Sequence, residues 1–449
     1  MKTIFISSFH PYISRNILAT DAFSILVAEP NVRIVLFTFE YKKDYFQKKF
    51  GHSNVIIEGI QLPPPSKKFF SLVMKRLAKF GLDSHSVSIE RRIKLEREGK
   101  FFYFIFATII AKFFTNIRLL RTIMRAIDFR VAAPYRFSEY FVRYKPDVVL
   151  ITDIQNERDV ELAHNARYFK IPSIGMVRSW DNLTTHGILR IVPDKLLVPS
   201  VRVKEQAIKI NDVPAERVEV VGISHYDKYA KGPKISREEF FALYDLPIEK
   251  KLIFCTVIGD VYIPNNTTDP YVLKLLSSLD VNIIVRFSPT VKVSALDGVK
   301  PYPNMRFDRP GVSFFDSKID DQELGDKDDD NLMHGIYYSD LVVCGPSTIV
   351  LDAAFFNKPI VLTGAFHPYK RKYLEGEHRY DYSHFLPFIA CGAGKLPRSS
   401  DEFLKAIEKR LKNPALDAEG QECFRRVYCN FRDGKAGERI ARAVLALIA

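Results

Sequence analysis

The chain has 449 residues, more than one hydrophobic core usually organises, so two domains are expected. Hydrophobic residues make up 47% of it and charged residues 27%, a globular composition that excludes a disordered chain. The formal net charge is +13, and between Ser66 and Lys145 there are 18 Lys and Arg against 6 Asp and Glu, so this one segment carries nearly all of it.

Apolar runs alternate with helix-length polar segments along the first half of the chain. Strands are predicted at 3–7, 32–39, 55–60, 147–152, 173–177, 195–199 and 218–223. Helices are predicted between most of them, which is typical of a doubly wound parallel sheet. We therefore expect an N-terminal Rossmann-like domain over residues 1–228.

A basic helical insertion at about 64–145 interrupts this series. Pro63, Pro64 and Pro65 stand at its entrance, and helical runs are predicted at 69–80 and 101–127. Its apolar and basic residues fit an amphipathic helix on an anionic membrane, where each basic residue contributes about 1 kcal/mol. They fit a helical subdomain with a solvated basic face equally well. No recognised nucleic-acid motif accompanies the charge, so nucleic acid is not an expected partner.

A second α/β series follows a linker at 228–251. Strands are predicted at 252–258, 282–287, 341–344 and 360–363, with helices near 271–279 and 331–338. This series predicts a second Rossmann-like domain over 250–430. Amphipathic helices are predicted at 400–411 and 435–448. The terminal segment 431–449 is a candidate for packing back against the N-terminal domain.

The cysteines and the apolar runs bear on the compartment. The five cysteines contain no C-x-x-C pair, and Cys255 and Cys344 lie in apolar strands as buried thiols, which suits a reducing cytoplasm. The N-terminus lacks the features of a signal peptide, and the longest apolar run, 101–114, is interrupted by Lys112 and too short to span a bilayer. We expect a cytoplasmic protein whose only membrane contact is peripheral, on the inner face.

The most informative stretch is the strand at 341–344 with the turn and helix that follow it. Gly345 ends the strand, and Ser347 and Thr348 then present hydroxyls and backbone N–H groups at a helix N-terminus, a place for a diphosphate. Asp352 lies one turn further, where a carboxylate can accept hydrogen bonds from a ribose diol. A strand, a turn and a serine-capped helix also occur in many α/β proteins without a nucleotide.

This stretch, with Lys358-Pro359 and the strand after it, resembles the C-terminal domain of GT-B glycosyltransferases and of the related CDP-glycerol glycerophosphotransferases. Pro346 replaces the commoner serine of that pattern, and Asp352 replaces the glutamate of many relatives. The resemblance implies two Rossmann-like domains facing a cleft, with the nucleotide donor in the C-terminal domain. It implies no metal ion or other cofactor.

Three further segments extend the resemblance. Arg286 and Ser288 stand where the relatives carry R-x-H-P, with Ser288 in place of the histidine, and Arg286 suits a donor phosphate or an ion pair at a strand end. Gly259 follows the first strand of the second domain, where a GT-B protein has a loop facing the cleft. His225 lies in a segment similar to G-x-P-x-x-D that closes the first domain beside the cleft.

Residues 178–187 follow a predicted strand and are dense in polar side chains, so we expect them to line the crevice. They resemble the S-W-D-N-L-T stretch of bacterial surface-carbohydrate transferases. Asp181 is a candidate base, and His186 is a candidate base or phosphate ligand. An Asx-turn that caps a helix around Asp181 explains the same residues without a function. The cleft-lining acceptor residues named by this segment are Trp180, Asn182 and Thr184.

An inverting transferase needs a base within reach of the acceptor hydroxyl, and GT-B relatives generally take it from the N-terminal domain. His10 follows the first strand and Asp153 follows the fourth, so they join Asp181 as candidates. The acidic run 326–330 lacks the spacing of a calcium loop and is expected to be a solvated loop, so no metal site is expected.

We therefore expect a metal-independent glycosyltransferase that moves a sugar from a nucleotide donor to a surface-polysaccharide, lipopolysaccharide or lipid-linked acceptor. A polyol-phosphate transferase would use the same donor site, although Ser288 counts against it. A nucleotide-sugar 2-epimerase has the same architecture but does not need the insertion. A catalytically inactive GT-B scaffold that binds partners remains the alternative outside catalysis.

Overall fold

The computed structural model describes residues 1–61, 68–131, 136–261, 263, 266–314, 322–363 and 377–448. The chain forms two compact units. Unit 1 comprises Met1–Ala230 with Asn430–Ala449, and unit 2 comprises Lys231–Cys429. The prolines expected at the entrance of the insertion, Pro63, Pro64 and Pro65, lie outside the described residues.

Unit 1 contains a seven-stranded sheet in the order β3-β2-β1-β4-β5-β6-β7. All neighbouring strands in it are parallel. Its strand residues are mostly buried, because helices cover both faces, and the strands are accordingly continuous apolar runs. The strands are β1 Lys2–Ser7, β2 Val32–Phe39, β3 Val55–Ile60, β4 Val148–Ile151, β5 Ser173–Met176, β6 Lys195–Val198 and β7 Val218–Val220.

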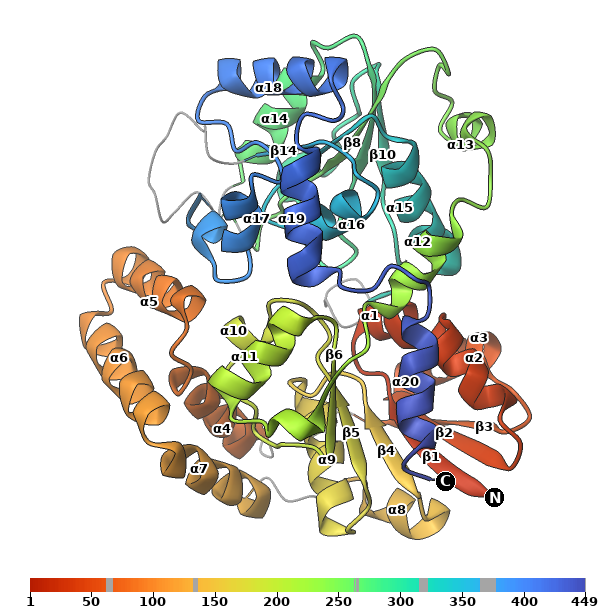
Figure 1. The fold of residues 1–449 in the computed structure, drawn as a ribbon, viewed down its shortest axis with the longest axis vertical. Helices are drawn as coiled ribbons and strands as arrows, with labels where there is room; N and C mark the ends of the chain where they lie inside the picture. The colour runs from red at the N-terminus through yellow and green to blue at the C-terminus, as the bar shows by residue number, and fades with distance from the viewer. Residues whose placement is uncertain are drawn as a thin grey trace. The chain divides into compact units, whose positions relative to one another are not determined.

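Helices pack on both faces of this sheet (Figure 1). One face is covered by α2 Asp21–Ala28, α3 Lys43–Phe50 and α20 Ala436–Leu445. The other face is covered by α8 Ser138–Tyr144, α9 Glu157–Tyr168 and α11 Val201–Asn211. The remaining helical elements, apart from the insertion, are α1 Pro11–Ile13, the π-helical turn η1 Ser14–Leu18, α10 Asn182–Thr185, α12 Asp227–Lys231 and the 3-10 turns η2 Glu40–Lys42, η4 Ala215–Arg217 and η5 Ser224–Tyr226.

The last helix of the chain belongs to the core of unit 1. Figure 1 shows α20, in blue, beside α2, in red. Gly437 permits this approach, because a Cβ there would lie 2.7 Å from the backbone nitrogen of Ala22. Asp227 accepts hydrogen bonds from the N–H groups of Ala436 and Gly437 at 2.9 and 2.6 Å, and so anchors the start of α20.

Besides α8, four helices of the described residues connect β3 to β4 in the region of the insertion: α4 Lys68–Phe80, α5 His85–Glu98, α6 Phe101–Asn116 and α7 Arg118–Val131. A small apolar cluster, which includes Met74, Leu82 and Met124, packs them against Ile188 of the segment after α10. The single helical run expected at 101–127 is wrong, because α6 and α7 meet at Ile117 with a bend of 101°. None of the described helices alone is long and apolar enough to cross a membrane, whereas this bent pair meets the same criteria of length and composition together.

Unit 2 contains a five-stranded parallel sheet in the order β10-β9-β8-β13-β14. Its strands are β8 Leu252–Thr256, β9 Asn282–Arg286, β10 Met305–Asp308, β13 Leu341–Cys344 and β14 Ile360–Leu362, and β11 Val312–Ser313 pairs antiparallel with β12 Gln322–Glu323. Its helices are α13 Arg237–Leu243, α14 Thr268–Leu276, η6 Ser294–Leu296, α15 Asp326–Tyr338, α16 Ile349–Phe355, η8 Glu377–Asp381, α17 Leu386–Cys391, α18 Ser400–Lys412 and α19 Ala418–Tyr428.

The acidic run 326–330, expected as a solvated loop, is instead the first turn of α15. Gly325 precedes the helix, and its N–H donates to the Asp328 carboxylate at 2.9 Å. Carboxylates are favourable at a helix N-terminus, where the N–H groups lack partners and the dipole is positive. The run is therefore explained by helix capping.

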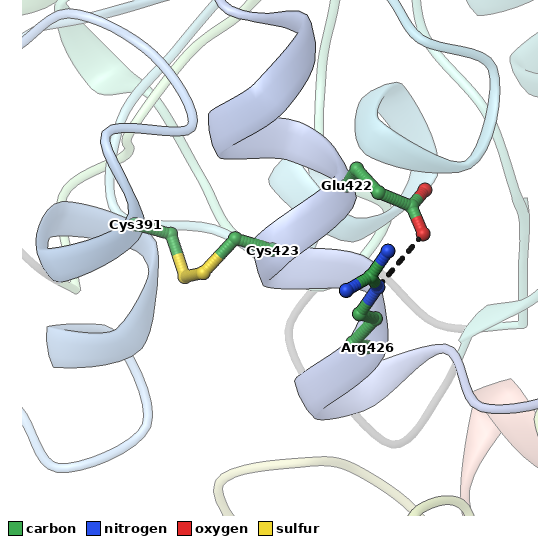
Figure 2. The surroundings of a disulfide bond; sticks show 4 residues. All are labelled: Cys391, Glu422, Cys423 and Arg426. Atoms are coloured by element: carbon green, nitrogen blue, oxygen red, sulfur yellow. Dashed lines mark hydrogen bonds and ion pairs between the residues drawn. A yellow bond between two sulfur atoms is a disulfide. The ribbon is translucent and has the colours of Figure 1, made fainter.

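A disulfide joins Cys391, the last residue of α17, to Cys423 in α19 (Figure 2). The remaining cysteines, Cys255, Cys344 and Cys429, are buried. The sequence analysis did not identify this pair, because a separation of 32 residues carries no motif.

We expect reduction of the disulfide to lower the melting temperature of the protein. Closing a loop of 32 residues stabilises a fold by about 3–4 kcal/mol in the chain-entropy description. Melting curves with and without reductant measure the shift, and the Cys391→Ser/Cys423→Ser variant should melt at the reduced value under both conditions. Five reactive thiols in the denatured, never-reduced protein would show that the pair does not form.

Candidate functional site

Polar residues gather where β1, β4 and β5 end in unit 1. His10 follows β1, Asp153 follows β4 and Arg178 follows β5. Parallel strands place their carboxyl ends at one edge of the sheet, where α/β proteins bind ligands. Asp153 and Arg178 pair at 2.7 Å between Oδ2 and Nε, and the charge of Arg178 is felt by both His10 and Asp181. The structure thus groups these predicted residues.

The Asp153 carboxylate is almost fully buried. One oxygen pairs with Arg178, and the other, Oδ1, has no hydrogen-bond partner among the described residues. A buried acceptor without a partner is costly, so this oxygen is the atom that a bound hydroxyl would satisfy.

Asp159, in the first turn of α9, belongs to the same group and was not predicted. Its Oδ1 accepts from the Ser7 hydroxyl and from the Asp153 N–H at 3.2 Å. Complete burial, and then the neighbouring charge of Asp153, raises the pKa of Asp159 to about 8. The carboxyl is therefore mostly protonated at neutral pH, beside the ion pair of Asp153 and Arg178.

His10 is held as a neutral imidazole. Its Nδ1 accepts the Tyr12 N–H at 3.2 Å, so the ring proton of the neutral form lies on Nε2. Burial, and then the positive charge of Arg178, lowers the pKa of His10 to about 3. A group with this pKa is a weak base at neutral pH, and its Nε2–H is instead a hydrogen-bond donor.

The segment after β5 turns into the short helix α10. The Asp181 carbonyl accepts the hydroxyls of Thr184 and Thr185 at 3.0 and 2.9 Å, and the Asp181 side chain is only half-buried. His186 is exposed, with Nδ1 3.0 Å from the Thr185 hydroxyl. Solvent reaches Asp181 and His186, and it also reaches the half-buried His10.

The other predicted residues of this segment are buried. Trp180 is 5% exposed, and the Thr184 carbonyl accepts a hydrogen bond from Ser84 of the insertion at 2.5 Å. Asn182 is 1% exposed, and its Oδ1 has no hydrogen-bond partner among the described residues. Trp180 and Thr184 are therefore packing residues that support the segment. Asn182 differs, because its Oδ1 is available to accept a hydrogen bond from a ligand or a water.

His225 lies apart from this group, in η5. Burial, and then the charges of Arg15 and Lys228, lowers its pKa well below the usual value. The rings of Tyr226 and Tyr229 lie against it, with centroids at 4.6 and 6.0 Å. These contacts describe a neutral histidine in an aromatic cluster, and its expected role beside a cleft stays a prediction.

In unit 2 the strand β13 ends at Cys344, and a Cβ on the following Gly345 would lie 2.5 Å from the Ile258 side chain. Ser347 is half-buried, Thr348 is exposed and Asp352 is buried. The helix α16 that follows has only seven residues, so its dipole alone is a modest attraction for a diphosphate. The predicted donor residues nonetheless lie along the same turn and the helix that follows it: Gly345, Ser347, Thr348 and Asp352.

The neighbouring strand β8 ends in a loop organised by Asp269, which was not predicted. This buried carboxylate accepts the N–H groups of Ile258 and Gly259 at 2.9 and 3.0 Å and the Asn266 amide at 2.5 Å. Gly259 has a φ of 88°, and a Cβ there would collide with Val291 at 2.2 Å. The glycine is required by this turn, beside Gly345.

Arg286 at the end of β9 is buried and pairs with Asp308 of β10, while its Nη2 donates to the Asp328 carbonyl at 2.8 Å. The ion pair that the sequence analysis kept as an alternative is therefore present. Ser288 lies 3.2 Å from the Thr290 hydroxyl. Arg309, which was not predicted, stacks on Phe287 at 3.7 Å and has no carboxylate partner among the described residues. Its charge is therefore more available to a donor phosphate than that of the paired Arg286.

Within the part of the chain that the structure describes, no three His, Cys, Asp or Glu side chains are placed to hold a metal ion. A cavity of about 480 Å³ lies in unit 1, lined by residues at the amino ends of β5, β6 and β7. It is therefore at the sheet edge opposite to His10, Asp153 and Asp181.

Solved structures share this fold. A UDP-GlcNAc 2-epimerase from Neisseria meningitidis bound to UDP-GlcNAc has 12% identity and a TM-score of 0.57, with 99% of this chain and 100% of that chain covered. A Methanocaldococcus jannaschii UDP-GlcNAc 2-epimerase in complex with UDP-GlcNAc and UDP has 14% identity and a TM-score of 0.55, with 99% and 100% covered. The wall teichoic acid polymerase TagF has 11% identity and a TM-score of 0.53, with 99% and 88% covered.

These likenesses establish the fold, which is the two-domain GT-B fold that the sequence predicted. Residues 318–446 match the family model of CDP-glycerol:poly(glycerophosphate) glycerophosphotransferase. The resemblance to this group is thereby confirmed over the segment that contains Gly345, Ser347, Thr348 and Asp352. No curated protein sequence matches the chain.

We expect Asp159→Asn to change how stability depends on pH. The folded carboxyl keeps its proton up to about pH 8, whereas an aspartate in the unfolded chain loses it near pH 4. The stabilisation from this group is therefore complete below about pH 4 and disappears as the pH rises to about 8.

Melting temperatures of the wild type and of Asp159→Asn between pH 5 and 8.5 measure this effect. The wild type should lose stability relative to the variant as the pH rises, because only its buried carboxyl must ionise. Parallel curves for the two proteins would mean that Asp159 is already ionised in the fold.

Proposed function

We propose that this protein is a transferase that takes a group from a nucleotide-activated donor and adds it to a surface-polymer acceptor. Unit 2 binds the donor, and unit 1 provides the acceptor site and the base. The observation that carries this proposal is the family match over residues 318–446, which includes the turn after β13. The GT-B fold supports it, since solved proteins with this fold are bound to UDP-GlcNAc or UDP.

The transferred group is a sugar in our first proposal. An acceptor hydroxyl then attacks the anomeric carbon, the bond from this carbon to the donor phosphate breaks, and a nucleoside diphosphate leaves. A polyol phosphate is the second candidate, favoured by the description of the matched family and by the fold likeness to TagF. The hydroxyl would then attack phosphorus, and a nucleoside monophosphate would leave.

Asp181 is our proposed base in unit 1. It is half-buried beside the charge of Arg178, whereas Asp153 is buried and paired, and the low pKa of His10 makes it a weak base. His10 instead donates from Nε2 to an acceptor oxygen, and Asp153 Oδ1 accepts from a neighbouring hydroxyl. We propose that the reaction needs no metal ion or other cofactor.

A nucleotide-sugar 2-epimerase is the remaining catalytic alternative, favoured by the fold likeness to the two epimerases. An epimerase would interconvert a free nucleotide sugar without an acceptor. A scaffold without catalysis would lack nucleotide binding altogether.

We expect the donor nucleotide to raise the melting temperature of the wild type by roughly 5 °C or more at about a hundredfold excess over Kd. The panel is UDP, GDP, CDP, CMP and dTDP, and a response to CMP or CDP favours the polyol phosphate. Ser347→Ala and Asp352→Asn should lose the response, since both lie in the matched turn and helix.

Asp181→Asn is the matched control, because it lies in unit 1 and should keep the full nucleotide response while losing turnover. Loss of the response in Asp181→Asn as well would contradict the division of roles between the units. Absence of any nucleotide response in the wild type, with lipid present, would leave the scaffold as the better account.

We also propose that the protein works at the cytoplasmic face of an anionic membrane, which it contacts through α6 and α7. The outer side of α6 exposes large apolar residues at helical spacing, among them Phe102, Phe106 and Phe113, with Phe102 85% exposed. The next helix, α7, likewise exposes Leu119, Ile123 and Ile127. Large exposed apolar residues gathered on two joined helices mark an interaction surface.

The charge of this face fits anionic lipid. Residues 101–131 contain five Lys and Arg and a single carboxylate, Asp128, which is fully buried. The α6 helix has 16 residues, about 24 Å of helix, which is shorter than a bilayer-spanning segment and suits a helix lying in the interface. Apolar side chains enter the acyl boundary, and the basic residues reach the phosphates.

We expect Phe102→Ser/Phe106→Ser to reduce cosedimentation with phosphatidylglycerol vesicles at least tenfold. Complete burial of a phenylalanine in lipid is favourable by about 1.5–3 kcal/mol, and serine lacks this contribution. Val142→Ser/Leu243→Ser is the matched control, since both residues are 65% exposed and lie outside α6 and α7.

Unchanged vesicle binding in the phenylalanine variant would rule out this surface as the lipid contact. A wild type that sediments as a dimer and becomes monomeric only in that variant would assign the face to a second copy of the chain.

A further inference from the structure

The cavity at the amino ends of β5, β6 and β7 is positively charged. Its volume is about 480 Å³, and four of its lining residues are cations: Arg125 of α7, Arg167 of α9, Lys170 before β5 and Arg217 before β7. The one carboxylate in the lining is Asp194, which accepts the Ser173 N–H at 2.8 Å and its hydroxyl at 3.2 Å. None of the four cations forms an ion pair within the described part of the chain.

Two of the guanidinium groups are held in place by neutral groups. Arg125 donates from Nε to the Leu189 carbonyl at 2.9 Å and from Nη2 to the Asn211 carbonyl at 2.7 Å. Arg167 lies over the Phe129 ring at 4.8 Å. Partial burial lowers the pKa of Arg125 to about 10, so it stays charged at neutral pH. Both groups are oriented, and their charge is not balanced by a carboxylate in contact.

Elsewhere in unit 1 several deeply placed arginines pair with acids, whereas the buried Arg91 donates to the carbonyls of Phe80 and Leu82. Arg190 pairs with Asp128 and Glu157, and Arg178 pairs with Asp153. Arg121, one turn before Arg125 on α7, pairs with Asp212 at 2.6 Å, so this carboxylate is engaged by Arg121 and forms no ion pair with Arg125. The cavity differs in that it gathers four cations, three of them exposed, with no ion pair to any of them in the described part of the chain. Oriented cations without acids are what a phosphate-binding site requires.

We propose that this cavity is a second anion site, separate from the candidate active site, and that it binds the phosphate of a phospholipid headgroup. The helix α7 borders both features: its exposed residues Leu119, Ile123 and Ile127 belong to the proposed lipid-contacting face, and Arg125, on the other side of the helix, lines the cavity. A free phosphate or diphosphate has the same chemistry and is the other source. The proposal does not rest on the transferase activity.

The test is a calorimetric titration with pyrophosphate, in a background of Ser347→Ala so that the candidate donor site does not contribute. Lys170→Gln/Arg217→Gln removes two cations at exposed positions. Arg125 is left unchanged because its guanidinium also holds two carbonyls of the fold. The control is Lys48→Gln/Lys209→Gln, which makes the same charge change at exposed positions of α3 and α11.

We expect pyrophosphate to bind roughly tenfold more weakly to the cavity variant than to the control, since a few cation–phosphate contacts are lost. Cosedimentation with phosphatidylglycerol vesicles distinguishes the sources. A matching loss of vesicle binding supports the lipid headgroup, and loss of pyrophosphate binding alone supports a free anion in the same site. Equal behaviour of the cavity variant and the control in both assays would overturn the proposal.

Discussion

The position of the insertion on unit 1 depends on a buried ion pair between Asp128 of α7 and Arg190 of the loop before β6. The Arg190 guanidinium donates to both Asp128 carboxylate oxygens at 2.8 Å and to Glu157 of α9 at 2.7 Å. His164 of α9 lies 3.1 Å from the Asp128 Oδ2 atom. Removing one partner of such a network leaves a buried charge and costs about 3–5 kcal/mol. This pairing fixes the rotation of α7, so that apolar residues point outward and Arg125 lines the cavity. Both the proposed lipid-contacting face and the proposed anion site lie on this helix.

The two units present different kinds of chemical groups at the ends of their strands. Unit 1 collects hydrogen-bonding groups of contrasting protonation at one sheet edge: a protonated Asp159, a neutral His10 and the Asp153–Arg178 pair. Unit 2 offers loops shaped by glycines, where Gly259 and Gly345 leave no room for side chains beside Val291 and Ile258. Close backbone approach suits a flat or anionic ligand, whereas a set of tuned donors and acceptors suits hydroxyl chemistry.

The sequence predicted what depends on strand ends and left out what depends on burial. His10, Asp153 and the segment around Asp181 follow apolar runs, and in parallel sheets this alone places them at one edge. Asp159 and Asp269 begin helices and look like ordinary capping carboxylates, so only the packed structure reveals their contacts. The Cys391–Cys423 pair follows no spacing rule, and the break at Ile117 occurs within an uninterrupted helical pattern. The acidic run 326–330 was misjudged because helix capping and a polar loop have the same composition.

The return of the chain to unit 1 also bears on the order in which the protein can fold during synthesis. Unit 2 is one continuous segment, Lys231–Cys429, whereas unit 1 needs α20, whose Ile440, Ala441 and Val444 complete the core around β1 and α2. On the ribosome, unit 2 is therefore the first to have all of its residues available. Until α20 emerges, one face of the sheet of unit 1 stays partly uncovered, so the apolar residues that α20 later buries are exposed to water during this interval.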